Sequence, residues 1–546
     1  MTPANANIMT LQQLLVQLQM DSTAITSDAQ AVSNPRLTAY QQLAQASPIL
    51  DIPFRQFQLD SRQVISGDAF ILLKSQSHSL QRSRGYAEQA MVQAAFILSE
   101  VDPSTLNLTK TKCPIIYVPA IRHILGSLIQ ASLQHQTVAK SKELGNEAAI
   151  ALPKVAAVTG TNGKTTISQL LAQLCQGAGM SSAIMGTAGN GRLGHLTQAS
   201  HTTGDALAVQ RFLMQMAAES VDLLALEASS HGLDQQRLQG VPIHIAIYSN
   251  LSRDHLDYHA DMAQYAAAKA KLFDRAHFDT LSHAIINIDD EFAPLMLEQA
   301  AKSGLEVWTY SLRPDAQASF VARQIQPSLE GSSIEIAGSF APIWVESPLL
   351  GRFNVANLLA AIAAAVALGV DVKQIPELVK SLQGASGRMQ RVEASEGCFI
   401  VDYAHTPDAL QQVMSSLKAH CQGQLWAVFG CGGDRDAGKR PLMAQAGLAV
   451  ADQVILTSDN PRSEDPLAIL KDMQVGMSAA QRERTHIEPD RRQAIGYAVQ
   501  HARVDDIVVI AGKGHESYQE IKGVRYDFDD TVVVQEALRE YGKVAN

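Results

Sequence analysis

The run PKVAAVTGTNGKTT, residues 153–166, decides the fold of the central part of this chain. Its first half is apolar, β-branched and closed by glycine, as in a buried strand before a tight turn, and ISQLLAQLCQGAG after it has helical periodicity. Between them, GTNGKTT predicts a phosphate-binding loop, in which glycines admit the phosphates, Lys164 reaches the terminal oxygens and the Thr165 hydroxyl can ligate Mg²⁺. The alternative is an ordinary strand–helix turn, which does not require a lysine. We therefore expect ATP and Mg²⁺ at this loop.

Outward from this loop, apolar runs recur at helix-length intervals. Those at residues 223–226, 244–249 and 284–288 predict a largely parallel sheet covered by helices. Further on, CFIVDY, LWAVFG, QVILTS and DIVVIAG each precede a polar, Gly-rich or Pro-rich loop, which predicts a second, Rossmann-like sheet that binds its ligand at the carboxyl ends of the strands.

Ahead of the loop, short helical patterns alternate with strand-like runs at residues 69–74 and 94–100, and the polar stretch AKSKELGNEA, residues 139–148, indicates a linker. The chain is thus predicted to be an α/β protein of three domains, with a central P-loop ATPase-type parallel sheet and a C-terminal Rossmann-like domain. The expected limits are residues 1–150, 151–383 and 384–546.

Bulk composition narrows the function further. The 546 residues are 46% hydrophobic and 18% charged, and the net charge of −10 argues against broad binding to nucleic acid or to a membrane surface. Five scattered cysteines, without a CxxC pair, indicate reduced thiols, and the sequence contains neither a signal peptide pattern nor an apolar run long enough to span a membrane. We expect a cytoplasmic monomer with no nucleic-acid or membrane partner.

Three motifs carry candidate metal chemistry. LLALE ends a predicted strand at Glu227, where a P-loop fold commonly places an acidic residue that faces the metal, although Ser229 or Ser230 beyond it could simply cap a helix. NLSRDHLDYH, residues 250–259, gathers histidines and aspartates after another strand, which makes His255 a candidate Mg²⁺ ligand. Lys269, by itself, is typical of a solvated helix lysine.

Taken in order, these motifs resemble the Mur ligases over residues 59–516. The motifs that carry the resemblance are LDSR, GTNGKTT, TTG, EASSHGLDQQR, NLSRDHLDYH, YAAAK, GRFNVANLLAA, VDYAHTPDAL, GCGGDRDAGKRPLM, DNPR and AGKGHE. The resemblance implies an N-terminal domain for the UDP end of the substrate, a central ATPase domain and a C-terminal domain for the incoming amino acid. ATP would phosphorylate the D-glutamate side-chain carboxylate, and the amine of the amino acid would attack the acyl phosphate.

Site residues follow from the resemblance, position by position. The implied catalytic residues are Lys164, Glu227, His255, Lys269, Arg388 and His405. ATP would be bound by Gly160, Thr161, Asn162, Gly163, Lys164, Thr165, Thr166, Asn357 and Asp402. Mg²⁺ would be held by Thr165, Glu227, His255 and Lys269, the last as a carbamate. UDP-N-acetylmuramoyl-L-alanyl-D-glutamate would contact Leu59, Ser61, His201, Thr202, Thr203, Ser229, Gln235 and Arg237.

DNPR discriminates between possible amino acids. A guanidinium can bind the second carboxylate of meso-2,6-diaminopimelate in a bidentate fork, whereas it would repel the terminal ammonium of lysine. The implied diaminopimelate-binding residues are Arg435, Asp459, Asn460, Pro461, Arg462, Gly512 and Glu516. Taken alone, DNPR could also be a Pro-containing turn with a solvated arginine.

The sequence departs from the family pattern at two places, and its function has three other interpretations. His201 stands where these relatives usually have asparagine, and the loop at residues 75–84 is longer and more basic than usual. The nearest alternative is a ligase like folylpolyglutamate synthase, against which DNPR and the motifs near the UDP end speak. A P-loop ATPase acting as a switch would hydrolyse ATP without an acceptor. A scaffold with a dead nucleotide site is disfavoured, because every catalytic residue type is present.

Overall fold

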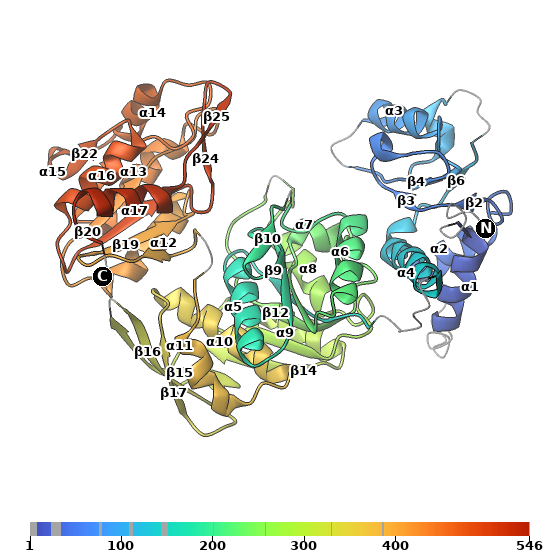
Figure 1. The fold of residues 1–546 in the computed structure, drawn as a ribbon, viewed down its shortest axis with the longest axis horizontal. Coiled ribbons are helices and arrows are strands. Elements are labelled where there is room, and N and C mark those ends of the chain that lie inside the picture. Colours follow the sequence, from blue (N-terminus) through green and yellow to red (C-terminus); the bar gives the residue numbers. More distant parts are fainter. Residues whose placement is uncertain are drawn as a thin grey trace. The chain divides into compact units, whose positions relative to one another are not determined.

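The computed structural model describes residues 8–22, 34–75, 79–108, 113–143, 151–199, 201–256, 258–328, 330–384 and 387–544 (Figure 1). The chain divides into two compact units. The first comprises Met1–Thr161, Met180–Ala284 and Pro294–Val307, and the second comprises Asn162–Gly179, Ile285–Ala293 and Trp308–Asn546. Both units take part of the central segment, and the domain limits expected from the sequence stay predictions.

The N-terminal part of the first unit is a small parallel sheet with helices on both faces. Its strands run in the order β3 (Phe57–Gln58), β4 (Ala69–Leu72), β5 (Phe96–Ser99) and β6 (Ile115–Tyr117). One face packs on α1 (Leu11–Ser22), α2 (Pro35–Ala44) and α4 (Leu125–Glu143), and the other packs on α3 (Leu80–Ala90). A short pair, β1 (Met9–Thr10) and β2 (Pro53–Phe54), completes it. The strands predicted at residues 69–74 and 94–100 are confirmed.

The predicted linker at residues 139–148 and the divergent loop at residues 75–84 are only partly described by the structure. Helix α4 continues to Glu143, so the first five residues of the expected linker are helical, because their composition does not break a helix. The rest of that linker, residues 144–148, lies outside the described residues. In the divergent loop at residues 75–84, positions 76–78 lie outside them as well, and α3 begins at Leu80.

The central part of the first unit continues with six neighbouring strands. They run in the order β10 (His195–Thr197), β9 (Gly189–Arg192), β8 (Ser182–Gly186), β11 (Leu223–Glu227), β7 (Lys154–Thr159) and β12 (Ile243–Tyr248). The four from β8 to β12 are parallel, as predicted, and β9 and β10 add an antiparallel edge. Its helices are α6 (Ala206–Ala218), α7 (Ser230–Asp234) and α8 (Met262–Ala270). β13 (His283–Asn287) and α9 (Ala293–Lys302) follow α8 along the chain, and the boundary between the two units crosses both elements.

The second unit begins with α5 (Lys164–Gly177), the helix after the phosphate loop. It continues through β14 (Glu306–Ser311) into an antiparallel meander of β15 (Phe320–Ser328), β16 (Gly331–Gly338) and β17 (Ile343–Ser347), which the sequence did not predict. Helices α10 (Arg352–Ala367) and α11 (Ile375–Lys380) follow, and α10 packs on α5. Asn357 therefore reaches the phosphate loop from α10.

The C-terminal part of the second unit is the predicted doubly wound sheet. Its strands run in the order β18 (Gln390–Val392), β19 (Cys398–Asp402), β23 (Ile507–Ala511), β20 (Leu425–Phe429), β21 (Gln453–Leu456) and β22 (Thr485–Ile487). All neighbours pair in parallel except β18 and β19. Alternate side chains point to opposite faces, so Ile400 and Phe399 enter separate cores.

Helices cover each of these two faces, and a hairpin lies beyond them (Figure 1). One core includes α12 (Pro407–Lys418), α13 (Lys439–Val450) and α14 (Pro466–Met473), and the other includes α16 (Arg491–His501) and α17 (Asp530–Glu540). The remaining elements are α15 (Ala479–Glu483) and the hairpin of β24 (Tyr518–Ile521) and β25 (Val524–Asp527). Among the residues described, no helix combines the length and apolarity needed to cross a membrane. The predicted α/β class is confirmed, with parallel strands in both the central and the C-terminal sheet.

Candidate active site

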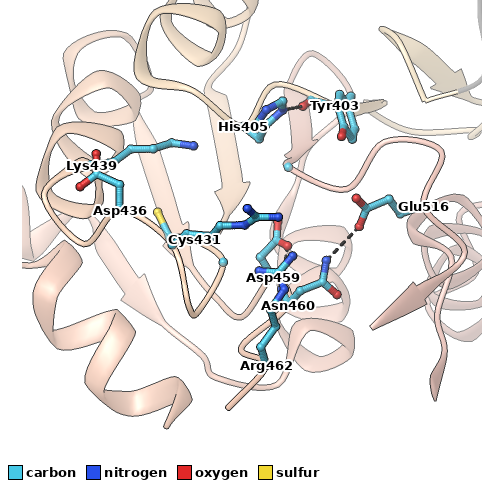
Figure 2. Close-up of a pocket in the computed structure, with 13 residues that line it drawn as sticks. Tyr403, His405, Cys431, Asp436, Lys439, Asp459, Asn460, Arg462 and Glu516 are labelled. Atoms are coloured by element: carbon cyan, nitrogen blue, oxygen red, sulfur yellow. Dashed lines mark hydrogen bonds between the residues drawn. The ribbon is translucent and has the colours of Figure 1, made fainter. Parts of the chain in front are cut away.

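A polar cavity of about 380 Å³ lies at the carboxyl ends of β19, β20, β21 and β23 (Figure 2). The loop after each strand supplies part of the wall, which is the position that an open parallel sheet predicts for its ligand. Six of the seven residues expected to bind the incoming amino acid line it, namely Arg435, Asp459, Asn460, Arg462, Gly512 and Glu516. Pro461 lies between two of them along the chain but is not part of the lining.

The backbone of the DNPR loop is fixed by the β24–β25 hairpin. Arg462 N–H donates to Glu520 O over 2.9 Å, and Lys522 N–H donates to Arg462 O over 2.6 Å. Arg462 adopts φ +50°, a left-handed conformation that a residue with a side chain rarely takes without such external bonds. Its Nη1 donates to Gly433 O over 2.8 Å. Arg462 is therefore held in one orientation at the pocket wall, and a freely solvated turn is excluded.

Asn460 and Glu516 form a second fixed edge of the pocket. Asn460 Nδ2 donates to Glu516 Oε2 over 2.9 Å, as the dashed line in Figure 2 shows. The buried Lys513 donates from Nζ to Glu516 Oε2 over 3.2 Å and to Asn460 Oδ1 over 3.4 Å. Glu516 is thus anchored from the protein side, with its carboxylate at the cavity.

The charges of the residues that line the pocket balance. Arg435, Lys439 and Arg462 supply three cations, and Asp436, Asp459 and Glu516 supply three carboxylates. In Figure 2 the side chains of Lys439 and Glu516 lie on opposite sides of the cavity. Burial raises the pKa of Cys431 to about 12, so this lining thiol is neutral near pH 7 and unsuited to nucleophilic catalysis. A ligand with ammonium and carboxylate groups at both ends matches this wall better than a simple anion.

The three predicted nucleotide residues of the C-terminal sheet lie beside this pocket. The guanidinium of Arg388 lies over the Tyr403 ring, 4.6 Å from its centroid, and the ring nitrogen Nδ1 of His405 is 2.9 Å from Tyr403 O. Asp402 is buried and accepts the N–H groups of Met389 and Ala404, each over 2.7 Å. Burial raises the pKa of Asp402, against the opposing charge of Arg388 and these two hydrogen bonds. In this arrangement Asp402 orients backbone, and His405 alone of the three lines the cavity.

The phosphate loop has the backbone that a close approach to phosphate needs. Gly160 and Gly163 adopt φ +146° and +86°, and α5 begins directly after them at Lys164. A Cβ on Gly163 would lie 2.4 Å from Asn357 Oδ1, a distance that real Cβ atoms essentially never show. Asn357 is held in place by donating from Nδ2 to Asn354 Oδ1 over 3.1 Å.

Gly163→Ala should therefore raise the KM for ATP by about tenfold or more, since both the left-handed φ and the contact with Asn357 oppose a side chain. Initial rates over a range of ATP concentrations measure this effect. Gly179→Ala is the matched control, because Gly179 also has a positive φ and nothing within 4 Å of an added Cβ. Equal KM values for the two variants would contradict the assignment.

In the first unit, five of the residues expected to hold the muramoyl dipeptide form one hydrogen-bonded network. The Thr203 hydroxyl donates to Glu227 O over 2.7 Å and accepts Ser229 N–H, and Arg237 Nη1 donates to Thr203 O over 2.9 Å. Gln235 Oε1 accepts two further bonds from Arg237. The Thr202 hydroxyl accepts from Thr187 Oγ1 over 3.0 Å. His201, which directly precedes Thr202, is exposed.

Leu59 and Ser61 belong instead to the N-terminal sheet region. The Ser61 hydroxyl is buried and donates to Gln89 Oε1 over 2.7 Å, and Leu59 packs against the core beneath the sheet. The expected contact of both residues with the UDP end stays a prediction.

The expected metal ligands differ in their surroundings. The Glu227 carboxylate is buried and accepts both the N–H and the hydroxyl of Thr187, over 2.8 and 3.2 Å. Lys269 is only 1% exposed and donates from Nζ to Gly160 O over 2.8 Å. His255 adopts φ +53°, is 44% exposed and lies 3.5 Å from Asp254. The interpretation of Lys269 as a solvated helix lysine is wrong, because α8 turns this position inward against Tyr265.

The predicted ATP and metal residues divide between the two compact units. Gly160, Thr161, Glu227, His255 and Lys269 belong to the first unit, and Asn162, Gly163, Lys164, Thr165, Thr166, Asn357, Arg388, Asp402 and His405 belong to the second. Among the described side chains, no group of three or more His, Cys, Asp or Glu is placed to hold a metal ion. The joint nucleotide and metal site stays a prediction.

Two family models match this chain. The Mur ligase middle domain matches residues 158–365, and the model described as Mur ligase, glutamate ligase domain matches residues 387–514. Together they cover more than half of the chain.

The chain belongs to the Mur ligase family.

Curated Mur ligases extend the match to nearly the whole chain. A UDP-N-acetylmuramoyl-L-alanyl-D-glutamate–2,6-diaminopimelate ligase from Chromobacterium violaceum is 40% identical over 499 residues, which cover 90% of this chain and 96% of the relative. The ligase of the same name from Pseudomonas aeruginosa is 40% identical over 489 residues, 89% of this chain and 96% of its own.

Solved structures of similar proteins also include a Mur ligase. A structure of a UDP-N-acetylmuramoyl-L-alanyl-D-glutamate–2,6-diaminopimelate ligase is 46% identical, with a TM-score of 0.69 and coverage of 90% of this chain and 96% of that chain. A folylpolyglutamate synthase from Mycobacterium tuberculosis in complex with ADP is 19% identical, with a TM-score of 0.55 and coverage of 71% of this chain and 92% of that chain, which shows a shared fold alone. The three-domain Mur ligase fold expected from the motifs is confirmed.

Several residues at these Mur ligase sites were not singled out from the sequence. Tyr403, Asp436 and Lys439 line the pocket, and Thr187 holds the carboxylate of Glu227. The signal for the first three was present, because each lies in a motif whose neighbouring residue was chosen. Thr187 follows β8 in the pattern GTAGN and could have been found only by noticing that its strand ends beside that of Glu227.

Proposed function

We propose that this Mur ligase joins meso-2,6-diaminopimelate to UDP-N-acetylmuramoyl-L-alanyl-D-glutamate with ATP as the activating substrate, a step of peptidoglycan precursor synthesis. The observation that carries the proposal is the pocket, in which Arg462 and Glu516 are each fixed by protein contacts at a wall of balanced charge. A guanidinium and a carboxylate so placed complement the distal carboxylate and ammonium of diaminopimelate. Lysine lacks that carboxylate.

The reaction needs activation, because a carboxylate is a poor electrophile. Transfer of the ATP γ-phosphoryl group to the D-glutamate side-chain carboxylate gives an acyl phosphate and ADP. The neutral amine of diaminopimelate then attacks the acyl carbon, phosphate leaves with the C–O bond electrons, and the nitrogen loses a proton as the amide forms. Lys164, at the start of α5, would stabilise negative charge on the transferred group. His405, which lines the pocket, would accept the proton of the attacking amine.

The donor set suits Mg²⁺ bound with a nucleotide. Mg²⁺ prefers oxygen ligands and usually takes one or two carboxylates together with substrate phosphates, so an all-protein cage is not needed. Thr165 and the buried Glu227 would supply such oxygens, with His255 and a Lys269 carbamate as further candidates. When bound, the ion would neutralise charge on the phosphates.

Carbamylation of Lys269 predicts a dependence on dissolved CO₂. The buried amine gains a carboxylate only by reacting with CO₂, so turnover should fall in buffer depleted of bicarbonate and recover on its addition. The measurement is initial rate against bicarbonate concentration. Lys269→Glu, which supplies a carboxylate directly, should retain some turnover and lose the bicarbonate dependence. A wild-type rate that is insensitive to bicarbonate depletion would argue that Lys269 acts as an amine.

The test of the proposed function is ATP consumption with each acceptor omitted in turn. The ligase should release phosphate only when the UDP-muramoyl dipeptide and diaminopimelate are both present, and lysine or ornithine should replace diaminopimelate poorly. Phosphate release with neither acceptor would instead indicate an ATPase switch. We also propose that the enzyme acts as a cytoplasmic monomer, which sedimentation and cell fractionation test.

A further inference from the structure

A buried ion pair joins two helices beside the pocket. Arg491, the first residue of α16, and Asp530, the first of α17, have side chains with no exposed surface. Arg491 Nε and Nη2 each donate to one oxygen of the Asp530 carboxylate over 2.7 Å. Burial disfavours the charged guanidinium, but the charge and hydrogen bonds of Asp530 raise the pKa of Arg491 above its ordinary value. Arg491 is therefore a fixed cation inside the domain.

The same guanidinium reaches the ends of two strands. Nη2 donates to Ala511 O over 3.0 Å, and Nη1 donates to Ser458 O over 3.4 Å. Ala511 directly precedes Gly512, and Ser458 directly precedes Asp459, and both following residues line the pocket. These strands, β23 and β21, are separated in the sheet by β20, so no ladder hydrogen bonds connect them. Arg491 thus bridges the two strand ends just before the loops begin, and the loops themselves are joined further along by the bonds of Asn460 to Glu516 and Lys513.

Stability alone is a weak reason for such a pair. Desolvating two charges is costly, and buried ion pairs can often be replaced by apolar residues without loss of stability. The planar guanidinium, however, offers donors in a fixed fork, which meets the two carboxylate oxygens and two carbonyls at once. No apolar residue, and no lysine, could do this.

We infer that Arg491 is a positioning residue for the diamino-acid pocket. With its plane fixed by Asp530, it fixes the distance between the strand ends from which the loops of Arg462 and Glu516 start, in addition to the contacts that join the loops themselves. This inference rests on the proposed function, in which these two residues hold one end of diaminopimelate. Displacement of binding groups by about 1 Å can cost about 10²-fold, so loosening the bridge should weaken the site without touching its lining.

The test replaces the pair by apolar residues, Arg491→Met with Asp530→Leu. The matched control is Arg492→Met with Glu536→Leu, which removes an exposed ion pair between the same two helices. For the first variant, we expect the KM for diaminopimelate to rise by about tenfold or more. Its preference over lysine should fall, while the KM for ATP and the melting temperature stay near wild type. The control should match wild type throughout.

Two results would overturn the inference. One is an unchanged KM for diaminopimelate, and the other is a parallel rise of all substrate KM values with a lowered melting temperature, which a purely structural pair would give. If the double variant does not fold, Arg491→Lys keeps the charge beside Asp530 but lacks the fork, and should show the same selective rise. Wild-type enzyme in the same assay separates the claims, because its failure with diaminopimelate would refute the proposed function itself.

Discussion

Arg462→Ala is expected to raise the KM for meso-diaminopimelate by about 30-fold to several thousand-fold, which corresponds to about 2–5 kcal/mol for a truncated, buried charge pair. The residue lines the pocket in a left-handed conformation, its backbone is paired with β24, and its Nη1 is held by Gly433 O. Because the fork is oriented before the ligand arrives, little is lost in ordering it, and its removal leaves the distal carboxylate unpaired. Initial rates against diaminopimelate concentration measure the effect.

The effect of Arg462→Ala should be confined to diaminopimelate. The KM for ATP should stay unchanged, and turnover with lysine should not fall, because lysine has no distal carboxylate and its terminal ammonium is repelled by the guanidinium. Arg539→Ala removes an exposed arginine of α17 in the same domain and serves as the control. Were Arg462→Ala to leave the KM for diaminopimelate within about twofold of the control, the pocket would bind something else.

Lys164→Met is expected to lower kcat by about 10²–10³-fold, the usual loss when one preorganised stabiliser of transition-state charge is removed. Lys164 begins α5 directly after Gly163, in a loop whose two glycines have positive φ and where backbone N–H groups and the helix dipole already favour phosphate. Its ammonium adds a positive charge that stabilises the negative charge on the transferred phosphoryl group. Single-turnover formation of ADP, with both acceptors present, measures the chemical step.

A distant lysine provides the control for this variant. Lys302 on α9 is exposed and paired with Glu298 over 2.6 Å, so Lys302→Met should behave as wild type. ATP binding, measured by titration, should weaken less than kcat falls, because the charge acts mostly on the transition state. Wild-type kcat in Lys164→Met would mean that the loop is an ordinary strand–helix turn.

Much of the fold was readable because strands and their following loops have local signals. Four of the six C-terminal strands, β19, β20, β21 and β23, were each found from an apolar run ended by a polar loop, and parallel pairing brings Asp459 and Gly512 to one edge. The six lining residues themselves were named from the resemblance to the Mur ligases, and the strand pattern predicted only that loops at this edge of the sheet bind a ligand. Strand position thus predicted where the pocket lies, whereas its residues and their roles came from the family resemblance.

What the sequence could not supply depends on tertiary contacts. The burial of Lys269 is set by how α8 packs, which a lysine among alanines does not reveal. The left-handed backbone of Arg462 is imposed by a hairpin about 60 residues later, as the pairing with Glu520 shows. The burial of Arg491 could not be predicted either, because the sequence DRRQ, residues 490–493, does not show which of its two arginines pairs with the buried Asp530. Long-range partners of this kind have no local pattern.

The central claim is that a nucleotide-activated carboxylate is joined to a diamino acid selected through its second carboxylate. The most direct test supplies the UDP-muramoyl dipeptide, ATP and equal concentrations of diaminopimelate and lysine, and identifies the product by mass spectrometry. The account predicts the diaminopimelate adduct in at least about 30-fold excess, formed with one ADP per amide bond. Comparable amounts of the two adducts, or ADP without either, would contradict it.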